Sequence, residues 1–165
     1  MIKGEFIGRE HLGPYVRKLG MQVIAEVEKS INILCIKLLR KVKEEKLSGK
    51  PLKNRTGTLR RSVNYRVEKS QTGLMFSIKG IVGTNKEYAA AHEYGFDGQV
   101  TVKEHLRLIK KAFGVSLKEP KQITVGSHTR HMRLPERSFL RSALREMESE
   151  IQSEIDNAIK RATSK

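Results

Sequence analysis

The sequence predicts an α+β fold, in which a long N-terminal helix and a C-terminal helix pack on a small antiparallel β-sheet and a long β-hairpin arm projects from it. Three observations support this: apolar residues at helical spacing near both ends, alternating segments in the middle, and a motif that occurs twice within 98–133. The 165 residues match the usual size of one domain. Residues 1–165 are therefore expected to form a single domain, with 98–133 as an inserted β-ribbon arm.

Apolar residues at steps of three and four predict one helix from about Pro14 to Lys46. Pro14 suits a first helical turn, and Gly49 and Pro51 suit its end. Such a helix is roughly 45–50 Å long at 1.5 Å per residue. Because a small domain needs less, part of the stripe is expected to pack on another subunit. The stripe consists of Val16, Leu19, Val23, Val27, Ile31, Leu34, Leu38 and Val42.

Alternation of apolar and polar residues predicts a hairpin after the polar loop Ser48–Thr58. Its strands are expected at Leu59–Lys69 and Leu74–Gly83, joined by a tight turn near Ser70–Gly73. Tyr88–Tyr94 is then predicted to be a short helical segment.

Gly95 is expected to stop that segment, and a second amphipathic helix to follow with Ser138 as its N-cap. The apolar face of this C-terminal helix consists of Leu140, Ala143, Leu144, Met147, Ile151, Ile155, Ala158, Ile159 and Ala162.

The segment between Gly95 and the C-terminal helix contains one motif twice, since the pattern of Val100–Arg107 (VTVKEHLR) recurs in Ile123–Arg130 (ITVGSHTR). In an extended chain, successive side chains point to opposite faces. Each copy then has an apolar side and a His/Arg side. The two copies are expected to pair as a long antiparallel ribbon with Lys110–Pro120 at its tip. Two alternatives are accidental β-patterning and a short helix in the HLRLIKKAF stretch.

The chain is strongly basic, with 33 Lys and Arg against 18 Asp and Glu and a net charge of +15. Lys50–Ser70 carries seven basic residues and one acid, and Gln99–Arg133 carries eight and two. The charge is either solvated or matched by a partner such as phosphate or an acidic protein ring. The candidate contact residues are Lys103, Arg107, Lys110, Lys111, Lys118, Lys121, Arg130 and Arg133.

The lone Cys35 excludes an intramolecular disulfide and is expected to be a buried structural thiol. The N-terminus has no apolar stretch typical of a secretory signal. The apolar run Ile31–Leu39 is too short to span a bilayer. The protein is therefore expected to be soluble, intracellular when made, and without a membrane partner.

The residue pairs that could suggest a metal site or an active site lack the further groups that such sites need. His128 and His131 are three apart, which on a strand places them on opposite faces, and no further ligands complete a zinc site. His92 with Glu93 lacks a positioned nucleophile or oxyanion donor. The sequence therefore predicts no enzyme, no metal and no cofactor.

The Pro135-x-Arg137-x-Phe139 motif is best explained by structure. Phe139 is expected to fill the core, and Arg137 to bond carbonyls of the Tyr88–Tyr94 block.

Three blocks occur in order: TGTLRRSV (Thr56–Val63), VGTNKEYAAAHEYG (Val82–Gly95) and RLPERSFLRSAL (Arg133–Leu144). Together they resemble the virion-morphogenesis or tail-completion proteins of tailed bacteriophages, minor proteins of the head–tail junction. The resemblance covers Thr56 to about Ala162. Its motif residues here are Thr56, Gly57, Leu59, Arg60, Ser62, Gly83, Thr84, Tyr88, Ala89, His92, Glu93, Tyr94, Gly95, Pro135, Arg137, Phe139 and Leu140.

The resemblance implies a structural protein of the virion neck without enzymatic activity. It implies a cyclic homo-oligomer that joins head connector to tail, contacts the neighbouring connector and tail-tube or tail-terminator rings, and passes DNA through its lumen. The protein would be in the virion, and in the host cytoplasm during assembly. High basicity and the ribbon of 98–133 depart from the family pattern. The alternative is a sequence-independent nucleic-acid-binding protein.

Overall fold

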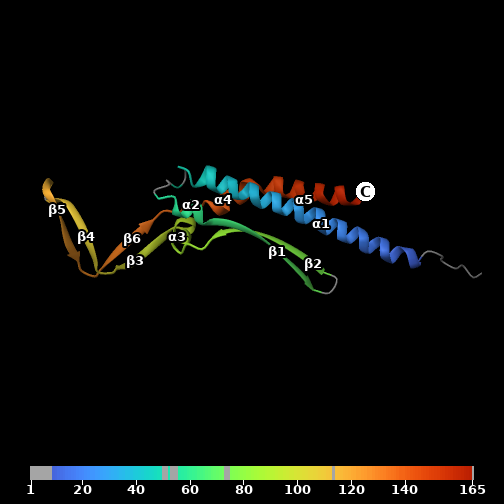
Figure 1. Cartoon of the computed structure of the whole chain (residues 1–165), viewed down its shortest axis with the longest axis horizontal. Helices are drawn as coiled ribbons and strands as arrows, with labels where there is room; N and C mark the ends of the chain where they lie inside the picture. The colour runs from blue at the N-terminus through green and yellow to red at the C-terminus, as the bar shows by residue number, and fades with distance from the viewer. Residues whose placement is uncertain (1–8, 50–51, 53–55, 73–74, 113, 165) are drawn as a thin grey trace, which may run out of the picture.

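A computed structural model describes residues 9–49, 52, 56–72, 75–112 and 114–164. It confirms an α+β fold, with three separate two-stranded antiparallel sheets. The elements in chain order are α1 (Arg9–Lys41), the π-helical turn η1 (Val42–Lys46), α2 (Thr58–Ser62), β1 (Val63–Thr72), β2 (Met75–Thr84), α3 (Tyr88–Tyr94), β3 (Phe96–Val102), β4 (His105–Ala112), β5 (Val115–Val125), β6 (His128–Leu134), α4 (Leu140–Glu146) and α5 (Glu148–Thr163). Figure 1 shows an elongated molecule with the helices and the β1–β2 hairpin on one side and the ribbon arm on the other.

The two long helices lie side by side, as Figure 1 shows. Ser30 on α1 donates a hydrogen bond to Glu154 on α5 (2.9 Å), and Lys37 lies 2.5 Å from Glu150. The predicted start of α1 is wrong: the helix begins at Arg9, so that Pro14 lies inside it. In the described chain, no helix has the length and apolar character that crossing a bilayer requires.

The apolar stripe of α1 is buried only toward its C-terminal end. Leu34 and Cys35 are buried, whereas Val16 and Met21 nearer the N-terminus are 60% and 67% exposed. Figure 1 shows why, because the N-terminal end of α1 extends beyond the end of α5. Burial raises the pKa of the Cys35 thiol, so this cysteine is the buried structural residue that the sequence predicts.

The core lies where the end of α1 and η1 meet α3, α4 and the start of the hairpin. Phe139 and Val42 are fully buried there, as expected for Phe139. The buried residues of this cluster are Val42, Leu47, Leu52, Val63, Ala89, Phe139 and Ala143. The core is therefore small and mostly aliphatic, and Phe139 is its only aromatic member among the described residues.

Strands β1 and β2 pair from Val63↔Thr84 to Thr72↔Met75, which confirms the hairpin. Its first strand begins later than predicted, because residues 59–62 belong to the short helix α2. Gly57 adopts a positive φ of 73° and its carbonyl accepts a hydrogen bond from Arg61 N (2.9 Å), which closes a helical turn there. The predicted turn lies partly at residues 73–74, outside the described part of the chain.

The C-terminal helix is interrupted, whereas the sequence predicts a continuous one. α4 and α5 meet at Met147, which is buried, and whose amide bonds the carbonyl of Leu144 (3.1 Å), three residues back. Phe139 occupies the N-cap position, one residue after the predicted Ser138. The hydroxyl of Ser138 still accepts a hydrogen bond from the amide of Ser142 in the first turn (3.2 Å).

The arm is a two-part ribbon, which confirms the predicted antiparallel pairing and excludes a helix at 105–112. β3 pairs with β6, from Phe96↔Leu134 to Val102↔His128. β4 pairs with β5, from His105↔Val125 to Ala112↔Val115, with a register shift after Ile109. The strands extend further than predicted, to the pair Ala112↔Val115; Phe113 lies outside the described residues.

Gly80 on β2 is where the hairpin approaches α1 most closely. A Cβ there would overlap Cys35 Sγ and lie 3.0 Å from Ile31 Cγ2. We expect Gly80→Ala to lower the free energy of unfolding by about 1–3 kcal/mol, as overpacking does in other cores. Urea unfolding measures this loss.

Two further variants separate the clash from a general effect of alanine. Gly83→Ala on the same strand meets no atom within 4 Å, so its stability should change by less than about 0.5 kcal/mol. Adding Cys35→Ala to Gly80→Ala removes the clashing sulfur and should recover part of the loss. If the two glycine variants were equally destabilised, the proximity to Cys35 would not be the cause.

Candidate functional site

The second and third motif blocks meet at the carboxylate of Glu93, on α3. This residue is only 4% exposed. Its Oε2 accepts hydrogen bonds from the amides of Phe139 (2.8 Å) and Leu140 (3.0 Å), and its Oε1 from the amide of Arg141 (2.8 Å) and the hydroxyl of Ser138 (2.8 Å). A side chain from α3 thus caps the first turn of α4, where backbone N–H groups have no partner within the helix.

Burial and hydrogen bonding act in opposite directions on Glu93. Burial alone raises the pKa of its carboxyl, but bonds from the amides of Leu140, Arg141 and Phe139 and from Ser138 outweigh it. The pKa is therefore below the ordinary value, and the carboxylate is charged at neutral pH. Arg141 Nε is a fifth donor to this carboxylate, 3.3 Å from Oε1. With its oxygens engaged by five donors, this group locks α3 to α4.

Arg141 is the residue of this junction that sequence reasoning missed. Its guanidinium donates to the Glu93 carbonyl (3.0 Å) and to Glu136 Oε1 (2.7 Å), and it stacks 4.6 Å from the centre of the Tyr94 ring. The prediction for Arg137 is corrected accordingly: its backbone amide, not its guanidinium, bonds a carbonyl of the Tyr88–Tyr94 block, that of His92 (2.8 Å). The sequence did offer one signal for this role: Arg141 is a cation two residues after Phe139, in the first turn of the predicted helix.

His92 and Glu93 do not form an acid–base pair. The His92 ring packs edge-on against Tyr88, with ring centres 6.1 Å apart, while Glu93 points to α4. The two side chains therefore have different partners.

The first motif block joins the same region. Ser62 Oγ lies 2.6 Å from Thr84 Oγ1, linking α2 to the end of β2. A pocket of about 320 Å³ brings residues of all three blocks together. It is lined by Leu47, Leu52, Thr56, Gly57, Thr58, Leu59, Arg60, Tyr88, His92 and Arg137.

Two of the motif residues, Gly95 and Pro135, lie where the chain changes direction around this junction. Gly95 has a φ of 79°, and a Cβ there would lie 3.1 Å from Glu136 N and 3.2 Å from Leu134 O, so only glycine fits. Pro135 connects β6 to the segment before α4. A second pocket collects the remaining motif residues Gly83, Thr84, Ala89, Glu93, Tyr94, Phe139 and Leu140 among its lining.

The repeated motif builds a corner in the arm. Figure 1 shows the ribbon turn sharply between its two parts, at residues 103–104 and 126–127. His105 Nδ1 lies 3.0 Å from Lys103 O, and in the second copy His128 Nδ1 lies 3.0 Å from Gly126 O. The two copies run antiparallel and form the same local bond, so that the corner is nearly symmetric.

The sequence predicts an apolar face and a His/Arg face for each copy of the motif, but the pairing of the two copies does not bring like faces together. Val100 lies opposite Arg130, and Val102 opposite His128. Cross-strand partners share a face, so the apolar side of one copy adjoins the His/Arg side of the other.

His131 Nε2 lies 2.9 Å from Asp97 Oδ1, its partner across the base of the arm. Within the described ranges, no three His, Cys, Asp or Glu residues are grouped so as to hold a metal ion.

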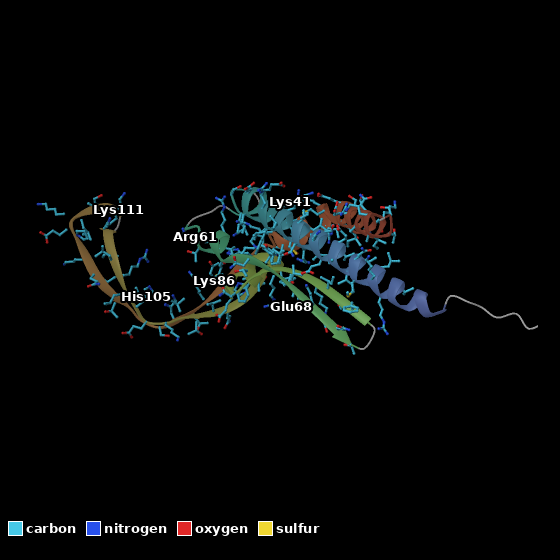
Figure 2. The ribbon with its side chains drawn as sticks, turned by 45° about the vertical axis from the view of Figure 1, so that its right-hand side comes forward. Lys41, Arg61, Glu68, Lys86, His105 and Lys111 are labelled. Carbon is cyan, nitrogen blue, oxygen red and sulfur yellow. The ribbon has the colours of Figure 1, made fainter. Side chains whose placement is uncertain are left out.

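Only one cation of the arm has an ionic partner in the part of the chain that the structure describes. Arg133, near the base, lies 3.5 Å from Asp97. For the other seven candidate contact residues, no ion pair occurs among the described residues. They are Lys103, Arg107, Lys110, Lys111, Lys118, Lys121 and Arg130, all of them exposed. Figure 2 shows His105 and Lys111 far from the body of the molecule.

Two regions of the molecule are thus candidate sites of interaction. One is the junction around Glu93, whose groups are engaged with one another. The other is the basic arm, whose groups are not. Comparisons with protein-family models, with curated proteins and with solved structures found no match to this chain.

Proposed function

We propose that this chain is a structural protein of the neck of a tailed-phage virion. In this role it forms a ring that joins the head connector to the tail. The observation that supports the proposal most directly is the meeting of the three motif blocks around Glu93 and the adjoining pocket. Residues that resemble a family only in sequence order here form one structural unit.

One feature of the surface supports assembly into an oligomer. The N-terminal end of α1 exposes apolar side chains, with Val16 at 60% and Met21 at 67%. This end of the helix extends beyond the end of α5 in Figure 1. Interfaces that repeat head to tail around an axis close into rings, and this end of α1 is the surface we assign to a neighbouring subunit.

Particle assembly tests this role. Deleting the gene from the phage or prophage that carries it should leave filled heads and complete tails unjoined, as seen by electron microscopy. Native mass spectrometry of the purified protein should show a closed oligomer. A variant with Val16→Glu and Met21→Glu should shift the mass toward the monomer, because charges replace exposed apolar contacts.

A matched change elsewhere provides the control. Thr101→Glu alters an exposed position of the arm base and should leave the oligomer intact. Joined, infectious particles without the protein would contradict the neck role. A strict monomer both in solution and in particles would contradict the ring.

A further inference from the structure

The outer part of the arm, strands β4 and β5, is called the far limb here. It contains five cations and a single acid, Glu119. Among the described residues none of the five makes an ion pair, and both Leu106 (63%) and Leu108 (57%) are exposed. The five cations are Arg107, Lys110, Lys111, Lys118 and Lys121. Like charges this close repel one another unless a partner matches them.

We infer that the far limb binds duplex DNA, without sequence preference, by lying in its major groove. The major groove is wide enough for a two-stranded β-ribbon. The eight residues of β4 span about 26 Å at 3.3 Å per residue, a large part of the roughly 34 Å helical turn of DNA. The limb therefore meets several phosphates of both strands at once.

The distribution of charge along the ribbon fits a groove. Arg107 and Lys121 share one face, because each pairs with a residue of the opposite strand at alternate positions (Ile123 and Ile109). Lys110, Lys111 and Lys118 lie at or beyond the register shift that follows Ile109, toward the tip. The five cations are therefore spread along the far limb. A groove places phosphates along both edges of an inserted ribbon, within reach of these long side chains.

The exposed leucines fit the same arrangement. Leu106 and Leu108 lie on the face of β4 opposite Arg107, since successive residues of a strand point to opposite faces. When this face is turned to the floor of the groove, the leucines contact base edges and thymine methyl groups, which are apolar. Such contacts tolerate most sequences, in contrast to bidentate hydrogen bonds.

The corner of the arm presents the far limb in a fixed direction. The bonds of His105 and His128 to Lys103 O and Gly126 O hold both strands at the bend. A preformed shape lowers the entropy lost on binding. The inference deepens the proposed neck role, in which DNA passes through the ring, but it depends only on the arm.

Fluorescence anisotropy with the full-length protein and a random-sequence duplex tests the inference. The logarithm of the binding constant should fall linearly with the logarithm of the salt concentration, with a slope of about −3 to −5 for four or five phosphate contacts at about −0.9 each. Lys110→Glu with Lys121→Glu should weaken binding at least tenfold at about 0.1 M salt and make the slope shallower by about 2.

The control has the same change of net charge away from the arm. Lys18→Glu with Lys79→Glu reverses two exposed lysines of α1 and β2, and should change the affinity less than about threefold, since charges beyond about 10 Å are screened at this salt. Poly-L-glutamate serves as the acidic-protein probe and should bind far more weakly than the duplex.

Three results would overturn the inference: no salt-dependent binding at low salt, an equal loss in both double variants, or poly-L-glutamate binding as tight as DNA binding. The last would make an acidic protein the partner of the arm. None of them affects the test of ring assembly or of head–tail joining, so the two proposals fail separately.

Discussion

Replacing Phe139 with alanine is expected to lower the free energy of unfolding by about 3–5 kcal/mol, the range for a fully buried phenylalanine. Its side chain is completely inaccessible and packs with Val42 and Ala143, so the cavity would open in the middle of the small core. Because a domain of this size is stable by only about 5–15 kcal/mol, the variant should be close to unfolding. Urea denaturation followed by circular dichroism measures the loss.

Phe76→Ala is the matched control, since Phe76 is 52% exposed near the end of the hairpin. Its loss should stay below about 1 kcal/mol. Similar losses for both variants would mean that Phe139 does not anchor the core.

Glu93→Gln is expected to destabilise the protein by about 2–4 kcal/mol at neutral pH, because hydrogen bonds to a charged group are worth about 1.5–3 kcal/mol and buried donors left unpaired are costly. Glutamine has the same shape. Its NH₂ group, however, faces amide donors such as those of Leu140 and Arg141 instead of accepting from them. Glu87→Gln, at an exposed position just before α3, should change stability by less than about 0.5 kcal/mol.

The pH dependence gives a second measurement of the same interaction. The folded-state pKa of Glu93 is lowered, so its contribution is complete above the unfolded value of about 4.3 and is lost as the pH falls through the folded-state pKa. The stability of the unmodified protein should therefore fall more steeply below about pH 4.3 than that of Glu93→Gln. Glu146 and Glu154 also have lowered pKa values, but they are present in both proteins and cancel in the comparison. Parallel curves would contradict the role of Glu93 as a charged cap.

The sequence was sufficient for those parts of the fold whose pattern is local or repeated. Helical spacing predicts α1 and the C-terminal helices, and the recurrence of Val100–Arg107 predicts the antiparallel arm. The bend of the arm was not predicted, because two-residue breaks at 103–104 and 126–127 leave the alternation of the pattern unchanged.

The junction could be predicted only as a set of residues, not as a mechanism. The predicted cap, Ser138, accepts a hydrogen bond from the amide of Ser142. The amides of Phe139, Leu140 and Arg141 instead donate to Glu93, on another helix. Such bonds depend on how α3 and α4 pack. The helical turn of residues 59–62 depends in the same way on the positive φ of Gly57.

The arm enters and leaves the body at a single point, since Phe96 and Leu134 are paired partners on neighbouring strands. Paired residues of an antiparallel ladder have Cα atoms about 4.5–5.5 Å apart, so a short turn could replace everything between them without moving Gly95 or Pro135. Body and arm are therefore separable in evolution: the arm can be gained, lost or exchanged as a module while the contacts of Glu93 persist. Related proteins that share the junction are then expected to differ most in the length and charge of this insertion.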